Sequence, residues 1–174
     1  MFWNKAVFSL GLVVGSTTLH AADESKVIDL KDGYVRVETR AYSVELPKGW
    51  KFGDETPWGA RKMSNSKSAG EMGTMTAGPS KATWDELYKT SMYFIMREEK
   101  GKATPFKIEK TSQGYEACTF TIVDDSGFAK RRYVLLKAKS GKVLALNVKI
   151  PSKAAEAEMA KHFDRMVRTA KIVE

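Results

Sequence analysis

The sequence contains one cysteine, Cys118, and only two histidines, His20 and His162, among its 174 residues. A single thiol cannot form an intramolecular disulfide, so packing must stabilise the fold. His20 lies in a segment that we expect to be removed, and His162 alone excludes the usual histidine-based zinc site. No serine lies in an elbow motif that would complete a catalytic triad with His162, and no glycine-rich phosphate loop occurs. We therefore predict no catalytic residues of these kinds, no resident metal and no cofactor.

The sequence also lacks a hydrophobic run long enough to span a bilayer. A short apolar stretch, residues 6–14, follows Lys5 and precedes the small residue Ala21. A positive residue, a short apolar run and a small residue at the cleavage point are typical of a secretory signal peptide. We therefore predict that residues 1–21 are a signal peptide, and that the protein is periplasmic or secreted.

Basic residues outnumber acidic ones, 29 to 21, and the formal net charge is +8, or +7 once Lys5 is removed. About 150 residues then remain, which is the size of one domain with its own core. A basic exported protein favours anionic partners, so the candidates are an acidic protein or an anionic polymer of the envelope. We expect no nucleic acid as partner. The alternative interpretation is that the positive charge only keeps the protein soluble.

Alternating apolar and polar residues predict most of the strands. Residues 22–33 are polar and are expected to form a flexible lead-in to a single domain over 34–174. Glycine, proline and serine mark the turns between the strands. The expected strands are residues 34–38, 42–46, 58–64, 71–77, 106–112, 115–124, 128–139 and 142–150.

Two segments carry the signals of helices. Thr83 and Glu86 form a capping box, and apolar residues then recur at helical spacing as far as residue 98. A second stripe predicts a helix over 152–171, with Ala155, Met159, Phe163, Met166 and Ala170 on one face. The order of elements predicts an α+β domain, with one antiparallel sheet flanked by helices.

One segment resembles a known family. Residues 42–50, Tyr-Ser-Val-Glu-Leu-Pro-Lys-Gly-Trp, are similar to the opening strand and Leu-Pro-x-Gly-Trp motif of PsbP-like and DcrB-like domains. The resemblance implies an α/β/α sandwich over the predicted domain. Members of that family are mostly binding or assembly factors without a shared catalytic site, so the resemblance implies no residue roles.

The remaining reactive side chains are interpreted first as core residues. Cys118 shares its strand face with two apolar residues, and a buried thiol is normally unreactive. Met72 and Met75 point to opposite faces of a strand and cannot share a metal. Met92 and Met96 are neighbours on the first helix, but two thioethers are too few ligands for Cu(I).

The last hairpin carries the sharpest hypothesis about a site. A two-residue turn at Ser140-Gly141 would place Arg132 opposite Lys149, and would place Val148 on the face of Cys118. Like charges directly opposite each other repel, and water, an internal carboxylate or a bound anion would relieve the repulsion. We therefore predict an anion-binding patch of Lys130, Arg132 and Lys149.

The leading interpretation is an exported, non-enzymatic binding or assembly protein of the cell envelope. One alternative is an envelope enzyme with a carboxylate or thiol site that the sequence does not reveal. Another alternative is a metal-handling protein that uses its methionines. The sequence identifies neither the ligand nor the oligomeric state.

Overall fold

The structure, a computed structural model, describes residues 25–174 except 55, 57–59, 66–69, 79 and 99–100. The predicted signal peptide, residues 1–21, lies outside the described residues. The elements in chain order are β1 Lys26–Asp29, β2 Tyr34–Glu38, β3 Tyr42–Pro47, β4 Lys51–Phe52, β5 Ala60–Ser64, β6 Glu71–Ala77, α1 Trp84–Glu98, β7 Lys102–Ala103, β8 Lys107–Lys110, β9 Glu116–Val123, β10 Ala129–Lys137, β11 Val143–Lys149, the 3-10 turn η1 Lys153–Ala155, α2 Glu156–Thr169 and β12 Lys171–Ile172.

The described strands form two antiparallel sheets, whereas the sequence predicted one. The first has the order β1-β2-β3-β12, and the second has the order β4-β5-β6-β11-β10-β9-β7, with β8 also paired to β9. Pro47 lacks an N–H group and ends β3, and Trp50 N donates to Pro47 O at 3.2 Å in the turn that follows. This turn leads the chain out of the first sheet and into β4 of the second.

The two predicted helices are present and have the expected packing faces. Glu86 Oε2 accepts from Thr83 N at 2.7 Å, and Thr83 Oγ1 accepts from Glu86 N at 3.3 Å, so both halves of the capping box form. In α2, Met159, Phe163 and Met166 are buried. No helix in the described part of the chain is long and apolar enough to cross a membrane.

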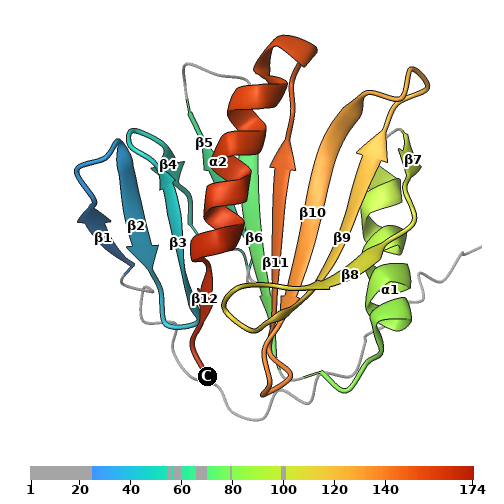
Figure 1. Cartoon of the computed structure of the whole chain (residues 1–174), viewed down its shortest axis with the longest axis horizontal. Coiled ribbons are helices and arrows are strands. Elements are labelled where there is room, and N and C mark those ends of the chain that lie inside the picture. The colour runs from blue at the N-terminus through green and yellow to red at the C-terminus, as the bar shows by residue number, and fades with distance from the viewer. Residues whose placement is uncertain (1–24, 55, 57–59, 66–69, 79, 99–100) are drawn as a thin grey trace, which may run out of the picture.

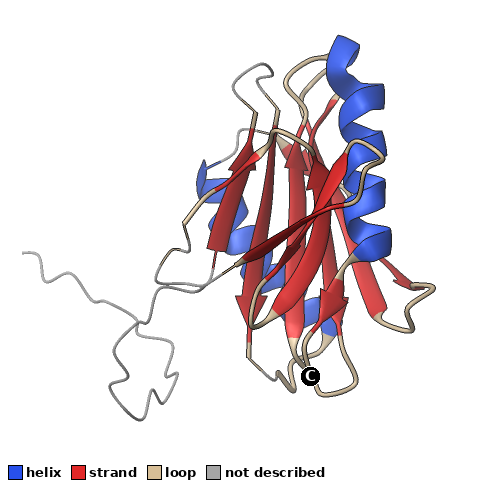
Figure 2. Ribbon diagram, turned by 90° about the vertical axis from the view of Figure 1, so that its left-hand side faces the viewer, coloured by secondary structure: helices blue, strands red, loops and turns tan. Residues whose placement is uncertain are grey.

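The helices lie on opposite sides of the sheets, with α2 in front and α1 behind β9 and β10 (Figures 1 and 2). Each helix covers its own hydrophobic core. The larger core joins α2 to both sheets and includes Val44 of β3 and Leu146 of β11. The smaller core joins α1 to β9, β10 and β11 around Cys118 and Phe120. The result is the predicted α/β/α arrangement.

Residues 26–29 form β1 at the edge of the first sheet, where the sequence predicted only a flexible lead-in. The strand is short, and three of its four residues are exposed. Because most of the strand is exposed, its sequence lacks the apolar alternation that reveals half-buried strands.

The turn between β10 and β11 has three residues rather than the predicted two. Ala138 N donates to Lys142 O, and Gly141 N donates to Ala138 O, both at 2.9 Å. Lys139, Ser140 and Gly141 therefore form the loop. A two-residue turn of type I′ needs a positive φ at both central residues, and of this pair only Gly141 has one, at 84°.

The extra turn residue shifts the register by one position and moves the side chains of β11 to the other face of the sheet from the one predicted. Arg132 lies opposite Val148, and Lys149 lies opposite Arg131. The predicted opposition of Arg132 and Lys149 is therefore wrong. Val148 packs in the larger core on the α2 side, and not beside Cys118 as the predicted register implied.

Candidate binding groove

The three residues of the predicted anion patch lie apart. Arg132 faces α2, and its Nη2 donates to Glu156 Oε1 at 3.2 Å. Lys130 lies near enough to Asp124 for their charges to interact. Lys149 projects from the opposite face of the sheet, because it alternates with Val148. The structure therefore does not bring Lys130, Arg132 and Lys149 together.

A groove runs along α2 on the face that carries Arg132. Its volume is about 770 Å³, and Thr119 of β9, Val134 of β10 and Phe163 of α2 form its floor. The α2 wall consists of Ala157, Ala160, Lys161, Asp164, Val167 and Arg168. The wall residues run from position 157 to position 168, which is eleven steps, so the groove follows the helix for about 16 Å at a rise of 1.5 Å per residue.

The groove combines an apolar floor with a charged rim. Val134 is 7% exposed and Phe163 is 3% exposed. Lys161, Asp164 and Arg168 are exposed on the helix above them. Asp164 is the only carboxylate in the described lining, and acid–base catalysis by paired carboxylates needs a second. The arrangement suits the binding of an apolar group better than the transfer of a proton.

Cys118 is fully buried, as its strand phase predicted, and it packs in the core beneath α1 with Phe120 and Ile122. Burial raises the pKa of the Cys118 thiol to about 11. The thiolate is the nucleophilic form of cysteine, and it is scarce near neutral pH at such a pKa. The thiol therefore does not support an enzymatic role.

The methionines considered as metal ligands are dispersed. Met72 is 1% exposed in the larger core, while Met75 is 44% exposed on the other face of the same strand. Met92 packs against the smaller core, and Met96 is 41% exposed. Among the described residues, no three His, Cys, Asp or Glu side chains are grouped in a way that could hold a metal ion.

The sequence matches no protein-family model and no curated protein. Among solved structures, the chain is similar to the solution structure of cyanobacterial PsbP (CyanoP) from Synechocystis sp. PCC 6803, with a TM-score of 0.55. The match has 14% sequence identity and covers 92% of this chain and 99% of the other. The chain has the PsbP fold. At this identity the likeness establishes architecture only, and it confirms the resemblance inferred from residues 42–50.

In this example of the PsbP fold, the Leu-Pro-x-Gly-Trp motif forms the turn after β3. Gly49 has a φ of 86°, which favours glycine at the third position of the turn from Pro47 to Trp50. The turn places the Trp50 ring edge-on to His162 of α2, with 6.3 Å between ring centroids. His162 Nδ1 is hydrogen bonded to the Tyr34 hydroxyl at 2.8 Å. His162 therefore helps to hold α2 and is not a solvent-facing residue.

An ionic network centred on the buried Glu45 lies next to this histidine and was not predicted. Glu45 of β3 is 4% exposed and accepts from Arg36 Nη2 at 2.9 Å and from Arg165 Nε at 2.9 Å. Arg165 also donates to Asp32 at 2.7 Å and lies 3.8 Å from the centroid of the Tyr34 ring. The network joins α2 to the first sheet. Its members are far apart in sequence, so no local pattern reveals it.

The groove residues were missed as well, although one sequence signal was available. Ala157, Ala160, Asp164 and Val167 recur at helical spacing on a second face of α2, beside the buried stripe. Small residues at two of these positions leave room above β9 and β10. The stripe of Met159, Phe163 and Met166 is the stronger apolar pattern of this helix and obscures the second face.

Proposed function

We propose that the protein is an exported, non-enzymatic binding or assembly protein of the cell envelope, and that the groove along α2 binds an apolar segment of an acidic partner protein. The observation that carries the proposal is the groove, in which an apolar floor remains open beside α2. Export rests on the signal-peptide pattern of residues 1–21, and the PsbP fold is compatible with a binding domain but assigns no activity.

The size and charge of the groove indicate the kind of segment that would fit. A length of about 16 Å matches a helix of about ten residues or a strand of about five. Lys161 and Arg168 place two cations on the rim against one carboxylate, Asp164. The net charge, +8 for the full chain and +7 once Lys5 is removed, adds a long-range attraction for an acidic partner and raises its association rate.

The two alternatives have less support. A thiol enzyme would need Cys118, which is buried beneath α1 and has a raised pKa. Among the described lining residues, a carboxylate enzyme in the groove would have Asp164 alone. A metal site at Met72 and Met75 would need both on one surface, and the strand separates them. Met92 and Met96 alone are too few thioether ligands.

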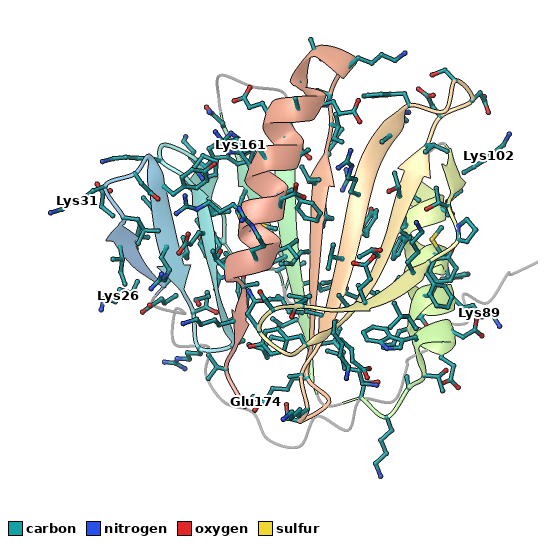
Figure 3. All side chains as sticks on the ribbon, viewed as in Figure 1. Lys26, Lys31, Lys89, Lys102, Lys161 and Glu174 are labelled. Carbon is teal, nitrogen blue, oxygen red and sulfur yellow. The ribbon has the colours of Figure 1, made fainter. Side chains whose placement is uncertain are left out.

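The proposal is tested by filling the groove and by reversing its charge. Ala160→Trp places a large ring in the groove, and Lys161→Glu reverses a rim charge. Ala154→Trp on the exposed turn before α2 and Lys26→Glu on β1 are the matched controls, because neither residue lines the groove. Figure 3 shows Lys161 on α2 and Lys26 at the far edge of the first sheet. Each variant is cross-linked in an envelope fraction, and its thermal unfolding is measured in parallel.

The expected result is a cross-linked partner protein with the wild type and with both controls. Ala160→Trp should abolish the cross-link, and Lys161→Glu should weaken it by about fivefold, which corresponds to one rim ion pair. Unchanged cross-linking by Ala160→Trp, with unchanged thermal unfolding, would contradict binding in the groove. Equal losses in Lys161→Glu and Lys26→Glu would show attraction by net charge alone.

A further inference from the structure

The strand β8 lies at an edge of the second sheet. Among the described strands it pairs with β9 alone, so its other side has no strand partner in that part of the chain. All four residues of β8 are exposed, and the apolar Ile108 is 51% exposed. No proline interrupts the strand. An open edge strand of this kind is a template for pairing with another strand.

The side chains of β8 alternate between the two faces of the sheet. Register partners on adjacent strands point to the same side of a sheet. Ile108 lies opposite Cys118 and therefore points to the α1 side. Lys107 lies opposite Thr119 of the groove floor and therefore points to the groove side. Glu109 points to the same side as Lys107, because side chains alternate along a strand.

The charges of Lys107 and Glu109 are not matched within the described part of the chain. Neither side chain has an ion pair or a hydrogen bond there. By contrast, Lys102 on the neighbouring strand β7 lies 3.7 Å from Asp125. The groove side of β8 therefore presents one positive and one negative charge at its edge, and the α1 side presents the apolar Ile108.

This pattern is complementary to a second copy of itself. Two strands related by a twofold axis perpendicular to the sheet run antiparallel, and the axis keeps each side chain on its own face. An axis at Ile108 places Lys107 opposite Glu109 of the second copy, and places the two Ile108 side chains opposite each other. An axis at Lys107, Glu109 or Lys110 instead places that residue opposite its own copy, where like charges repel. Only the register centred on Ile108 avoids a like-charge pair.

We propose that two copies of the protein associate in solution through their β8 strands, in antiparallel pairing centred on Ile108. The outer backbone groups of each strand then gain hydrogen-bond partners, the two Ile108 side chains leave water, and two ion pairs between Lys107 and Glu109 form across the axis. A strand of four residues gives a small interface, so the dimer is weak and forms at high protein concentration. The association does not depend on what the groove binds.

The first test measures the oligomeric state by sedimentation velocity over about a hundredfold range of protein concentration. The wild type should change from monomer to dimer as its concentration rises. Lys107→Glu gives the edge two negative charges and Glu109→Lys gives it two positive charges, so each variant should dimerise about tenfold more weakly or less. Lys26→Glu on β1 changes the net charge by the same amount as Lys107→Glu, and it should dimerise as the wild type does. Thermal unfolding confirms that each variant is folded.

The second test mixes the Lys107→Glu and Glu109→Lys proteins. In a mixed pair, an edge with two negative charges lies opposite an edge with two positive charges, so dimerisation should return to about the wild-type level. Both variants keep a net positive charge, so their overall charge does not attract them to each other.

Three results would overturn the proposal. A wild type that stays monomeric at every concentration would mean that the lysines of β8 protect the edge from pairing. Equal weakening in Lys107→Glu and Lys26→Glu would place the association on another surface. A mixture that associates no better than its separate components would exclude the register centred on Ile108.

Discussion

Cys118 shows how burial controls the chemistry of a single residue. Its side chain is fully buried, and its pKa is raised to about 11. We therefore expect an aromatic disulfide reagent to modify the native protein slowly at pH 8 and the urea-unfolded protein rapidly. The measurement is the rate of thiol release with and without urea. Rapid modification of the native protein would show that the smaller core opens readily.

The raised pKa of Cys118 also predicts a pH dependence of stability. The thiol titrates near 9.0 in an ordinary environment and near 11 in the folded protein. The folded state therefore holds its proton more tightly, and this contribution is complete below pH 9 and is lost as pH rises towards 11. The loss should reach about 3 kcal/mol, from two pKa units at 1.36 kcal/mol each. Urea unfolding of wild type and Cys118→Ala at several pH values measures it. Parallel curves for the two proteins would contradict the shift.

The residue scale also shows where prediction from sequence succeeded and failed. The alternation of Cys118, Phe120 and Ile122 correctly gave the buried face of β9, because a strand's phase is a local property. The sequence predicted Arg132 as the partner of Lys149, whereas the structure has Arg131, and one additional residue in the turn accounts for the difference. Moving a register by one position reverses a strand's faces, so a correct strand still produced an incorrect site.

At the scale of elements, the hairpin between β10 and β11 depends on Gly141. Its φ of 84° is unfavourable for residues with a Cβ atom. Gly141→Ala should therefore lower the free energy of unfolding by about 1–2 kcal/mol. Gly78→Ala is the control, because a Cβ atom there meets nothing within 4 Å and the φ of Gly78 is ordinary. Chemical denaturation measures both, and equal stabilities would contradict the positive φ of Gly141.

The side chain of Arg165 attaches α2 to the first sheet. Arg165 bonds both Glu45 and Asp32, and Glu45 is buried. Arg165→Ala leaves Glu45 with one fewer partner away from water, which should cost about 2–3 kcal/mol. Arg168→Ala, one turn further along α2, removes an exposed side chain and should cost less than about 0.5 kcal/mol. Urea denaturation measures the free energy of unfolding of both variants. A small loss of stability in both would mean that water satisfies Glu45 when the Arg165 side chain is removed.

At the scale of the whole molecule, the sequence predicted the elements better than their assembly. The capping box at Thr83 and the Met159-Phe163-Met166 stripe are local signals, and both helices formed where expected. The packing of the two sheets against each other rests instead on long-range contacts such as the 2.6 Å hydrogen bond between Tyr42 of β3 and Thr74 of β6. The groove has the same origin, because it exists only when α2 lies on β9 and β10. Such long-range contacts leave no periodic pattern in the chain.

The two sheets should nevertheless unfold together, because one core joins them. Val44 of the first sheet and Leu146 of the second both pack in the cluster that contains Met166 of α2. Met166 is 0% exposed, so Met166→Ala should cost about 2–5 kcal/mol and weaken both sheets equally. Met96→Ala, at a site that is 41% exposed, is the matched control and should cost less than about 1 kcal/mol.

Hydrogen exchange measured by mass spectrometry tests this cooperativity. Peptides from β2–β3 and from β10–β11 should lose protection in parallel in Met166→Ala, because global unfolding then dominates exchange in both. The Met96→Ala protein should retain the wild-type protection in both regions. If β2–β3 exchanged well before β10–β11, the first sheet would be a separate unit that α2 holds only through the Arg165 network. The two sheets would then unfold independently, although their side chains pack in one core.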